Sequence, residues 1–151
     1  MGCCVPSQEH HDPHSVSLAK LTVKFTDSLP LHLDSLIVVT NGSMDFDPYE
    51  VKFANKDIKE KHVIENGIIK AGSVVQLKLN KEGIKQVLYI TFPEETGALT
   101  DYKMHQSIMK ALQTAFEFDN VKVGFSLPRF EDLKIDERIY ESKLINALRL
   151  F

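Results

Sequence analysis

The sequence has few cysteines, no long apolar run and no excess of basic residues. Its only cysteines are Cys3 and Cys4, so the rest of the chain has no disulfide, thiolate nucleophile or cysteine-based zinc site. No apolar run approaches the roughly 20 residues that span a bilayer, and no apolar segment after the start indicates a secretory signal. All seven glycines are isolated, which excludes a glycine-rich phosphate loop.

The charge and the composition indicate an ordinary globular domain. The net charge of −3 disfavours binding through nucleic-acid phosphates, and sequence-specific recognition of a nucleic acid is not expected either. The hydrophobic fraction of 43% and the charged fraction of 26% are typical of globular proteins. A chain of 151 residues fits one domain that buries roughly two-thirds of its unfolded surface.

Residues 1–17 are polar and are expected to form a flexible tail with a possible lipidation site. Gly2 becomes the terminal amine once Met1 is removed, and N-myristoylation requires a glycine amine. The usual pattern has Ser or Thr where this chain has Pro6, with Ser7 one place later. The alternative is an accidental match on a disordered segment.

A myristoyl chain by itself holds a membrane only marginally, so stable anchoring needs a second signal. The tail has no lysine before Lys20, and Glu9 and Asp12 make it acidic, which excludes a polybasic signal. Cys3 and Cys4 stand where palmitate could follow. The expected location is therefore cytoplasmic, at the cytosolic face of a membrane.

Three histidines in the tail do not predict a metal site. His10 and His14 would share one face of a helix, but Pro13 lies between them, and the surrounding residues are typical of a flexible polar segment. No metal and no cofactor are expected.

Residues 18–151 show regular elements in alternation. The β-branched run at 33–40 is typical of a strand that is covered on both faces. Tyr102, Met109, Leu112 and Phe116 form an apolar stripe at helical spacing. The expected strands are 18–25, 33–40, 73–79, 85–92 and 121–127. The expected helices are 48–65, 100–118 and 136–151. This order predicts an α/β domain over residues 18–151 with helices packed on a sheet.

Three segments resemble the macro domain, a module best known for binding ADP-ribose. Residues 33–44 (LDSLIVVTNGSM) are similar to the family's Val-Asp-Ala-Ile-Val-Asn-Ala-Ala-Asn strand and its exit. Residues 85–92 resemble its Ile-Ile-His-Thr strand, and residues 124–128 resemble its Ile-Ala-Phe-Pro strand. The resemblance implies a three-layer α/β domain with a mixed central sheet and helices on both faces.

The resemblance also implies ligand-binding residues. Asp27 stands where the family often has the aspartate that binds adenine. Asn41 matches an asparagine that the family's hydrolases use to position the distal ribose, and Arg129 begins the segment that would surround an anion. Each has a structural alternative: Asp27 in a turn, Asn41 ending its strand, and Arg129 paired with the carboxylates that follow it.

Macro domains hold the diphosphate with two glycine-rich loops, because backbone N–H groups must approach the phosphates closely. The first loop here, residues 42–49 (GSMDFDPY), lacks the run of glycines and adds Asp45 and Asp47. The second loop, residues 129–134 (RFEDLK), contains no glycine. Val38 replaces a second asparagine of the hydrolases, so no catalytic residues are assigned.

The sequence therefore predicts a non-catalytic macro-like binding or scaffold module, with an unidentified protein partner and a lipid anchor to a membrane. The alternative is a reader of ADP-ribose or a related nucleotide, or an ADP-ribosyl hydrolase, with atypical loops. A different α/β nucleotide-binding module is the third hypothesis.

Overall fold

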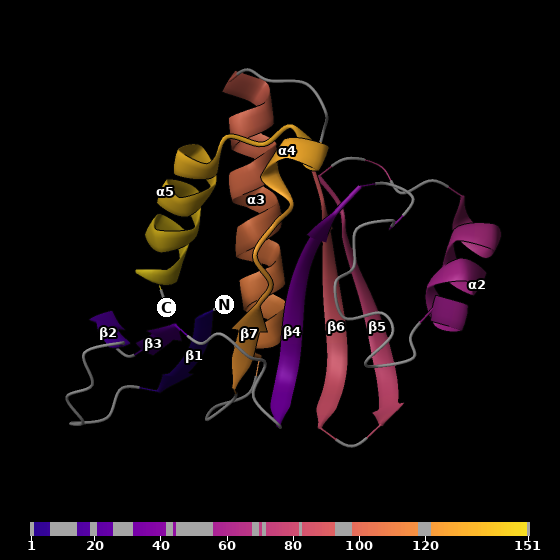
Figure 1. The fold of residues 1–151 in the computed structure, drawn as a ribbon, viewed down its shortest axis with the longest axis horizontal. Helices are drawn as coiled ribbons and strands as arrows, with labels where there is room; N and C mark the ends of the chain where they lie inside the picture. Colours follow the sequence, from indigo (N-terminus) through magenta and orange to yellow (C-terminus); the bar gives the residue numbers. More distant parts are fainter. Residues whose placement is uncertain are drawn as a thin grey trace.

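The computed structural model describes residues 2–6, 15–18, 21–25, 32–41, 44, 56–67, 70, 72–81, 83–92, 98–117 and 122–150. The strands are β1 (Gly2–Pro6), β2 (Ser15–Leu18), β3 (Leu21–Phe25), β4 (Leu33–Thr40), β5 (Val74–Lys81), β6 (Ile84–Thr91) and β7 (Val123–Phe125). The helices are α2 (Lys56–Asn66), α3 (Ala98–Ala115), α4 (Phe130–Leu133) and α5 (Glu137–Leu148) (Figure 1). Within these ranges, no helix has the length and apolar character that crossing a bilayer requires.

The described strands form one mixed sheet in the order β2-β3-β1-β7-β4-β6-β5. β4 pairs in parallel with β6 on one side and with β7 on the other, so that Ile37 lies opposite both Leu88 and Phe125. The other pairs are antiparallel. β4 is buried almost throughout because it lies between two strands and has a hydrophobic core on each face, as its β-branched run predicts.

The two faces of the sheet have separate cores. Ile37 and Val39 of β4 belong to one core, and Leu36 and Val38 belong to the other, because alternate residues of a strand point to opposite faces. Residues of α3 and α5 complete the first core, and Val63 of α2 packs against the second core. The three-layer α/β architecture with helices on both faces is therefore confirmed (Figure 1).

The buried face of α3 differs in part from the predicted stripe. Its core residues repeat at helical spacing and are Met104, Ile108, Ala111, Leu112 and Ala115. Leu112 was correctly placed in the stripe, but the Tyr102 side chain is 58% exposed, and its hydroxyl accepts a hydrogen bond from Gln106. Tyr102 lies two residues before Met104, which is more than half a turn away from the buried face.

The structure differs from the predicted flexible tail at two segments. Gly2–Pro6 forms β1 between β3 and β7, and Ser15–Leu18 forms β2 at the edge of the sheet beside β3. The physical reason is that β7 would otherwise expose unpaired N–H and C=O groups, which β1 satisfies from Gly2 to Cys4. Residues 7–14, with the three histidines of the tail, lie outside the described residues.

The other elements lie close to the predicted ranges. β4 has the predicted bounds, and β5, β6, α3 and α5 differ from prediction by one to three residues at their ends. α2 matches the second half of the predicted helix 48–65, whose first half lies outside the described residues. The short helix α4 was not predicted.

Candidate functional site

The carboxyl ends of the parallel strands β4, β6 and β7 meet at one edge of the sheet, where ligands of α/β folds commonly bind. Residues 40–41, 91–92 and 126–128 end or directly follow these strands, and we call them the carboxyl edge. The Phe92 N–H donates to the Thr40 carbonyl at 3.4 Å, and the Ser126 N–H donates to the Ile37 carbonyl at 2.9 Å. The three strand exits are therefore tied together, and the first and second loops continue from this edge.

The first loop leaves β4 through a hydrogen-bonded turn. The Met44 N–H donates to the Asn41 carbonyl at 3.0 Å. Met44 has a φ of 57°, in the left-handed region that favours glycine, and its side chain is only 2% exposed in the core beside α2. Asn41 is half-buried directly after β4, and its backbone carbonyl accepts this hydrogen bond.

Sequence reasoning missed Lys59, a buried lysine of α2. Its side chain is 4% exposed, and its Nζ donates to the Met44 carbonyl at 3.1 Å. The same Nζ lies 5.9 Å from the centroid of the Tyr89 ring on β6, within cation–π range. A weak signal was present, because Lys59 precedes the core-facing Val63 by four residues and so shares its face of the helix.

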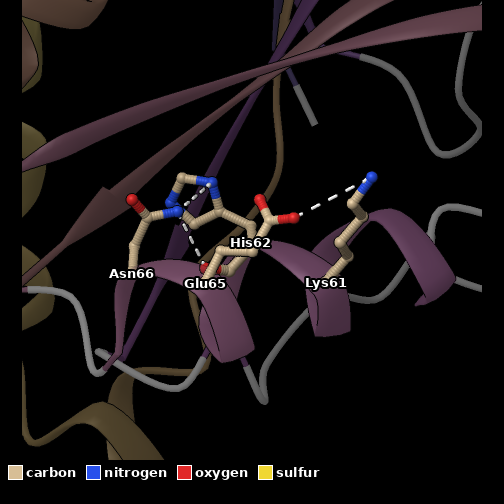
Figure 2. Close-up of polar contacts among 4 residues, drawn as sticks. All are labelled: Lys61, His62, Glu65 and Asn66. Carbon is tan, nitrogen blue, oxygen red and sulfur yellow. Dashed lines mark hydrogen bonds and ion pairs between the residues drawn. The ribbon is translucent and has the colours of Figure 1, made fainter.

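The outer face of α2 carries a different set of polar contacts. Figure 2 shows Lys61 and Glu65 as an ion pair with a nitrogen–oxygen distance of 3.9 Å. The Asn66 side chain donates to the His62 carbonyl at 3.0 Å and lies 3.4 Å from His62 Nδ1. Because Lys61 and Glu65 are mostly exposed, this pair contributes little to stability, in contrast to the buried Lys59 contact.

The second loop folds into the single turn of α4. Arg129 precedes the helix, and its Nε lies 2.7 Å from Asp132 Oδ2, so the predicted local pairing of this arginine with a carboxylate is present. The Ile135 N–H donates to the Phe130 carbonyl at 3.0 Å. Lys134 ends the helix with a φ of 54°, and its N–H bonds to the carbonyls of this turn.

A buried hydroxyl occupies the end of β6. Thr91 Oγ1 donates to the Lys70 carbonyl at 2.8 Å and accepts from the Ser73 N–H at 3.2 Å. The Gly72 N–H donates to the Thr91 carbonyl at 2.6 Å, with a φ of 85° that suits glycine. These bonds fix the start of β5 against the carboxyl edge.

Three aromatic rings connect the carboxyl edge, the second loop and α5. The Phe130 ring meets the Tyr140 ring edge to face at 5.6 Å, and the Phe92 ring lies 6.2 Å from Tyr140. The Tyr140 side chain is buried, and this burial raises the pKa of its phenol. The second loop therefore rests on an aromatic cluster, whereas the first loop is held by a buried ammonium group.

A charged pair lies at the opposite edge of the sheet. Asp34 accepts from the Lys122 N–H at 2.7 Å, and Lys85 Nζ lies 2.9 Å from its other oxygen. Burial opposes ionisation of Asp34, but the hydrogen bonds and charges of Lys122 and Lys85 together outweigh it and lower the pKa of the carboxyl. This pair joins the starts of β4 and β6 to the residue before β7.

The predicted site residues are thus only partly placed. Asn41 and Arg129 follow from neighbouring strands of the same edge, whereas Asp27 lies outside the described residues. Gly2, Cys3 and Cys4 lie in β1 rather than in a free segment. In the part of the chain that the structure describes, no three metal-ligating side chains gather into a site.

Comparison with solved structures identifies the fold. The macro domain of ganglioside induced differentiation associated protein 2 has a TM-score of 0.62 and 15% identity, over 79% of this chain and 62% of that chain. This chain therefore spans less than two-thirds of that solved chain. The macrodomain of Mycobacterium tuberculosis DarG has a TM-score of 0.58 and 12% identity, over 82% and 88% of the two chains.

The sequence itself matches no protein-family model and no curated protein at a significant level. At identities of 12–15%, this structural similarity establishes the fold and nothing finer. The predicted resemblance is confirmed at that level: this chain has the fold of a macro domain.

Proposed function

We propose that this protein is a non-catalytic binding module that holds ADP-ribose or a related nucleotide at the carboxyl edge, between the first and second loops. The fold supports the class of ligand, because the macro domain is the module best known for ADP-ribose. The edge itself supports the location, since it brings together the exits of three parallel strands.

The observation that carries the proposal is the backbone of the two loops. Among the described residues, two other than glycine have positive φ, and they are Met44 in the first loop and Lys134 in the second. Glycine is used in such loops because it adopts left-handed conformations at little cost. Each loop therefore has a left-handed backbone position at a residue other than glycine, a conformation that glycine commonly provides in phosphate-binding loops, and this supports a binding role.

The polar groups of the edge support binding rather than catalysis. The Thr91 hydroxyl is committed to backbone groups of the β5 approach, and the Arg129 guanidinium is paired with Asp132. A general base or nucleophile needs a partner that activates it and access to the substrate. The described groups instead hold the edge in place, and Arg129 remains exposed enough to exchange its carboxylate for a ligand phosphate.

The test is a calorimetric titration of the full chain with ADP-ribose. We expect a one-site isotherm that Arg129→Ala weakens by about tenfold, the effect of losing one charge-assisted hydrogen bond. Arg149→Ala, at the exposed end of α5, is the matched control and is expected to bind like the wild type. An ADP-ribosylated protein incubated with the chain is expected to keep its modification, and its release would contradict the non-catalytic part.

Absence of heat at high ligand concentration would contradict the nucleotide proposal. It would favour the alternative in which the same edge contacts a protein partner and the fold serves as a scaffold. Equal affinity of Arg129→Ala and the wild type would retain binding but move it away from the second loop.

We further propose that Gly2, Cys3 and Cys4 are acylated with myristate and palmitate in a membrane-bound state at the cytosolic face. The Gly-Cys-Cys motif and the need for two lipid signals support this proposal. In the folded domain these residues pair with β3 and β7.

The anchor is tested by expressing the wild type, Gly2→Ala and Cys3→Ser/Cys4→Ser in eukaryotic cells and comparing the membrane fraction of each. We expect the wild type in the membrane fraction and both variants in the soluble fraction. Equal partitioning of the three proteins would contradict the proposed lipid anchor and would leave the proposed nucleotide site untested.

A further inference from the structure

The first loop contains a backbone conformation that its sequence does not favour. Met44 has a φ of 57°, and for a residue with a Cβ the left-handed region costs roughly 1–2 kcal/mol. Its side chain is almost fully buried, so the residue cannot relax to another conformation without leaving the core. Such a conformation persists only where the surrounding structure stabilises it.

Lys59 supplies a contact of the required kind. Its Nζ donates to the Met44 carbonyl at 3.1 Å, so it binds the peptide group whose orientation the Met44 backbone sets. The lysine is 4% exposed, and Tyr89 of β6 lies beside its ammonium group. A hydrogen bond from a charged donor is about twice as strong as a neutral one, and burial strengthens it further.

The hydrogen bond from Lys59 to the Met44 carbonyl joins α2 to the first loop. Lys59 and Val63 are four residues apart on one face of the helix, and Val63 packs on the same core as Met44. Lys61, two residues later, is 75% exposed and pairs only loosely with Glu65 (Figure 2). The helix therefore presents one lysine to the first loop and another to solvent.

We propose that Lys59 is a positioning residue for Met44 of the first loop: its ammonium group holds the Met44 carbonyl and so keeps Met44 in the left-handed conformation, which glycine commonly provides in phosphate-binding loops. Its consequence for ligand affinity depends on the function proposed above. Its consequence for the Met44 backbone does not depend on any ligand.

The test compares Lys59→Met with the matched control Lys61→Met in the full chain. Methionine keeps an unbranched apolar chain that is one atom shorter than that of lysine, and it removes the charged donor. Backbone NMR chemical shifts of Met44 are sensitive to its φ and ψ, and the shifts of Leu112 in the other core report overall folding. We expect Lys59→Met to move the Met44 shifts away from left-handed values while those of Leu112 stay in place. Lys61→Met is expected to change neither residue, and Lys59→Arg, which retains a charged donor, is expected to preserve the Met44 shifts.

Unchanged Met44 shifts in a folded Lys59→Met would overturn the proposal. A wild-type measurement decides the case in which that variant does not fold. The Lys59 ammonium protons are expected to exchange slowly with water and to show nuclear Overhauser effects to Met44, whereas those of Lys61 exchange fast. Equally fast exchange of the two lysines would overturn the proposal as well.

ADP-ribose titrations separate this inference from the proposed function. If the wild type binds, Lys59→Met is expected to weaken affinity by about tenfold, the equivalent of one charge-assisted hydrogen bond. Unchanged affinity together with a changed Met44 backbone would show that the first loop does not contact the ligand. If the wild type does not bind, the proposed function fails, and the Met44 shifts still decide the role of Lys59.

Discussion

Met44 in the first loop and Lys134 in the second reach the same backbone conformation by different means. Met44 in the first loop is held by its own buried side chain and by the ammonium group of a distant helix. Lys134 in the second loop has an exposed side chain and is held by hydrogen bonds within the turn of α4, beside the buried Leu133 and Ile135. A left-handed residue other than glycine can therefore be stabilised by tertiary packing or by a local helix end. These two kinds of support should respond differently to mutation.

The largest expected difference comes from truncating the two left-handed residues. Met44→Ala removes a buried side chain and should destabilise the protein by about 2–4 kcal/mol. Lys134→Ala removes only an exposed side chain and should cost no more than about 0.5 kcal/mol. Urea denaturation measures the free energy of unfolding of both variants. Equal losses of stability would contradict the proposed difference between Met44 and Lys134.

Glycine at the second position should have the opposite effect to glycine at the first. Lys134→Gly removes the strain of a Cβ in the left-handed region and should stabilise the protein by about 1 kcal/mol. Met44→Gly relieves the same strain but opens a cavity, so it should destabilise. Thermal unfolding of the pair tests this difference, and a less stable Lys134→Gly would show that its side chain supports the loop.

The aromatic support of the second loop predicts a pH dependence. Tyr140→Phe keeps the ring contacts and should lie within about 1 kcal/mol of the wild type at pH 7. Burial raises the pKa of Tyr140, so only the unfolded state releases the phenol proton near pH 10, and the wild type loses stability as the pH rises above that value. The variant lacks this loss. Urea denaturation at pH 7 and above pH 10 should show a gap that widens in favour of Tyr140→Phe, and a constant gap would contradict the assignment.

The smallest effect is expected at the surface of the second loop. The side chains of Arg129 and Asp132 are 61% and 43% exposed, so Asp132→Asn should cost about 0.3 kcal/mol at low salt and less at high salt. If Arg129 also contacts an anionic ligand, the same variant should bind it more tightly, because the competing carboxylate is gone. A large, salt-independent loss of stability would show that the Arg129–Asp132 ion pair stabilises the second loop as much as the Lys59 contact stabilises Met44 in the first loop.

Much of the central fold follows from local sequence pattern. The bounds of β4 are predicted because an unbroken β-branched run is typical of a strand buried on both faces. α3 and α5 are predicted because their apolar residues recur at helical spacing. The N-terminal strand β1 was not predicted, because Gly2–Pro6 has no alternating pattern and gains its place from the open edge of β7, more than 100 residues away.

Less of the candidate site follows from the sequence. The positions of Asn41 and Arg129 after their strands are read directly from the resemblance, and the carboxylate partner of Arg129 is read from its near neighbours. Lys59 could not be assigned in this way, since a lysine within a charged helix is usually solvated. Its burial depends on its contacts with Tyr89 of β6 and with the Met44 carbonyl, and neither contact is a local property of the helix.

The sequence by itself determined the α/β class, the central buried strand, the absence of glycine from the second loop and the confinement of cysteine to two positions. These features depend on periodicity and composition, which act within a few residues. The tertiary structure decided the pairing of β1, the burial of Lys59 and the left-handed backbone of Met44. Each of these depends on contacts between segments distant in sequence, whose combined free energy can outweigh local conformational preference.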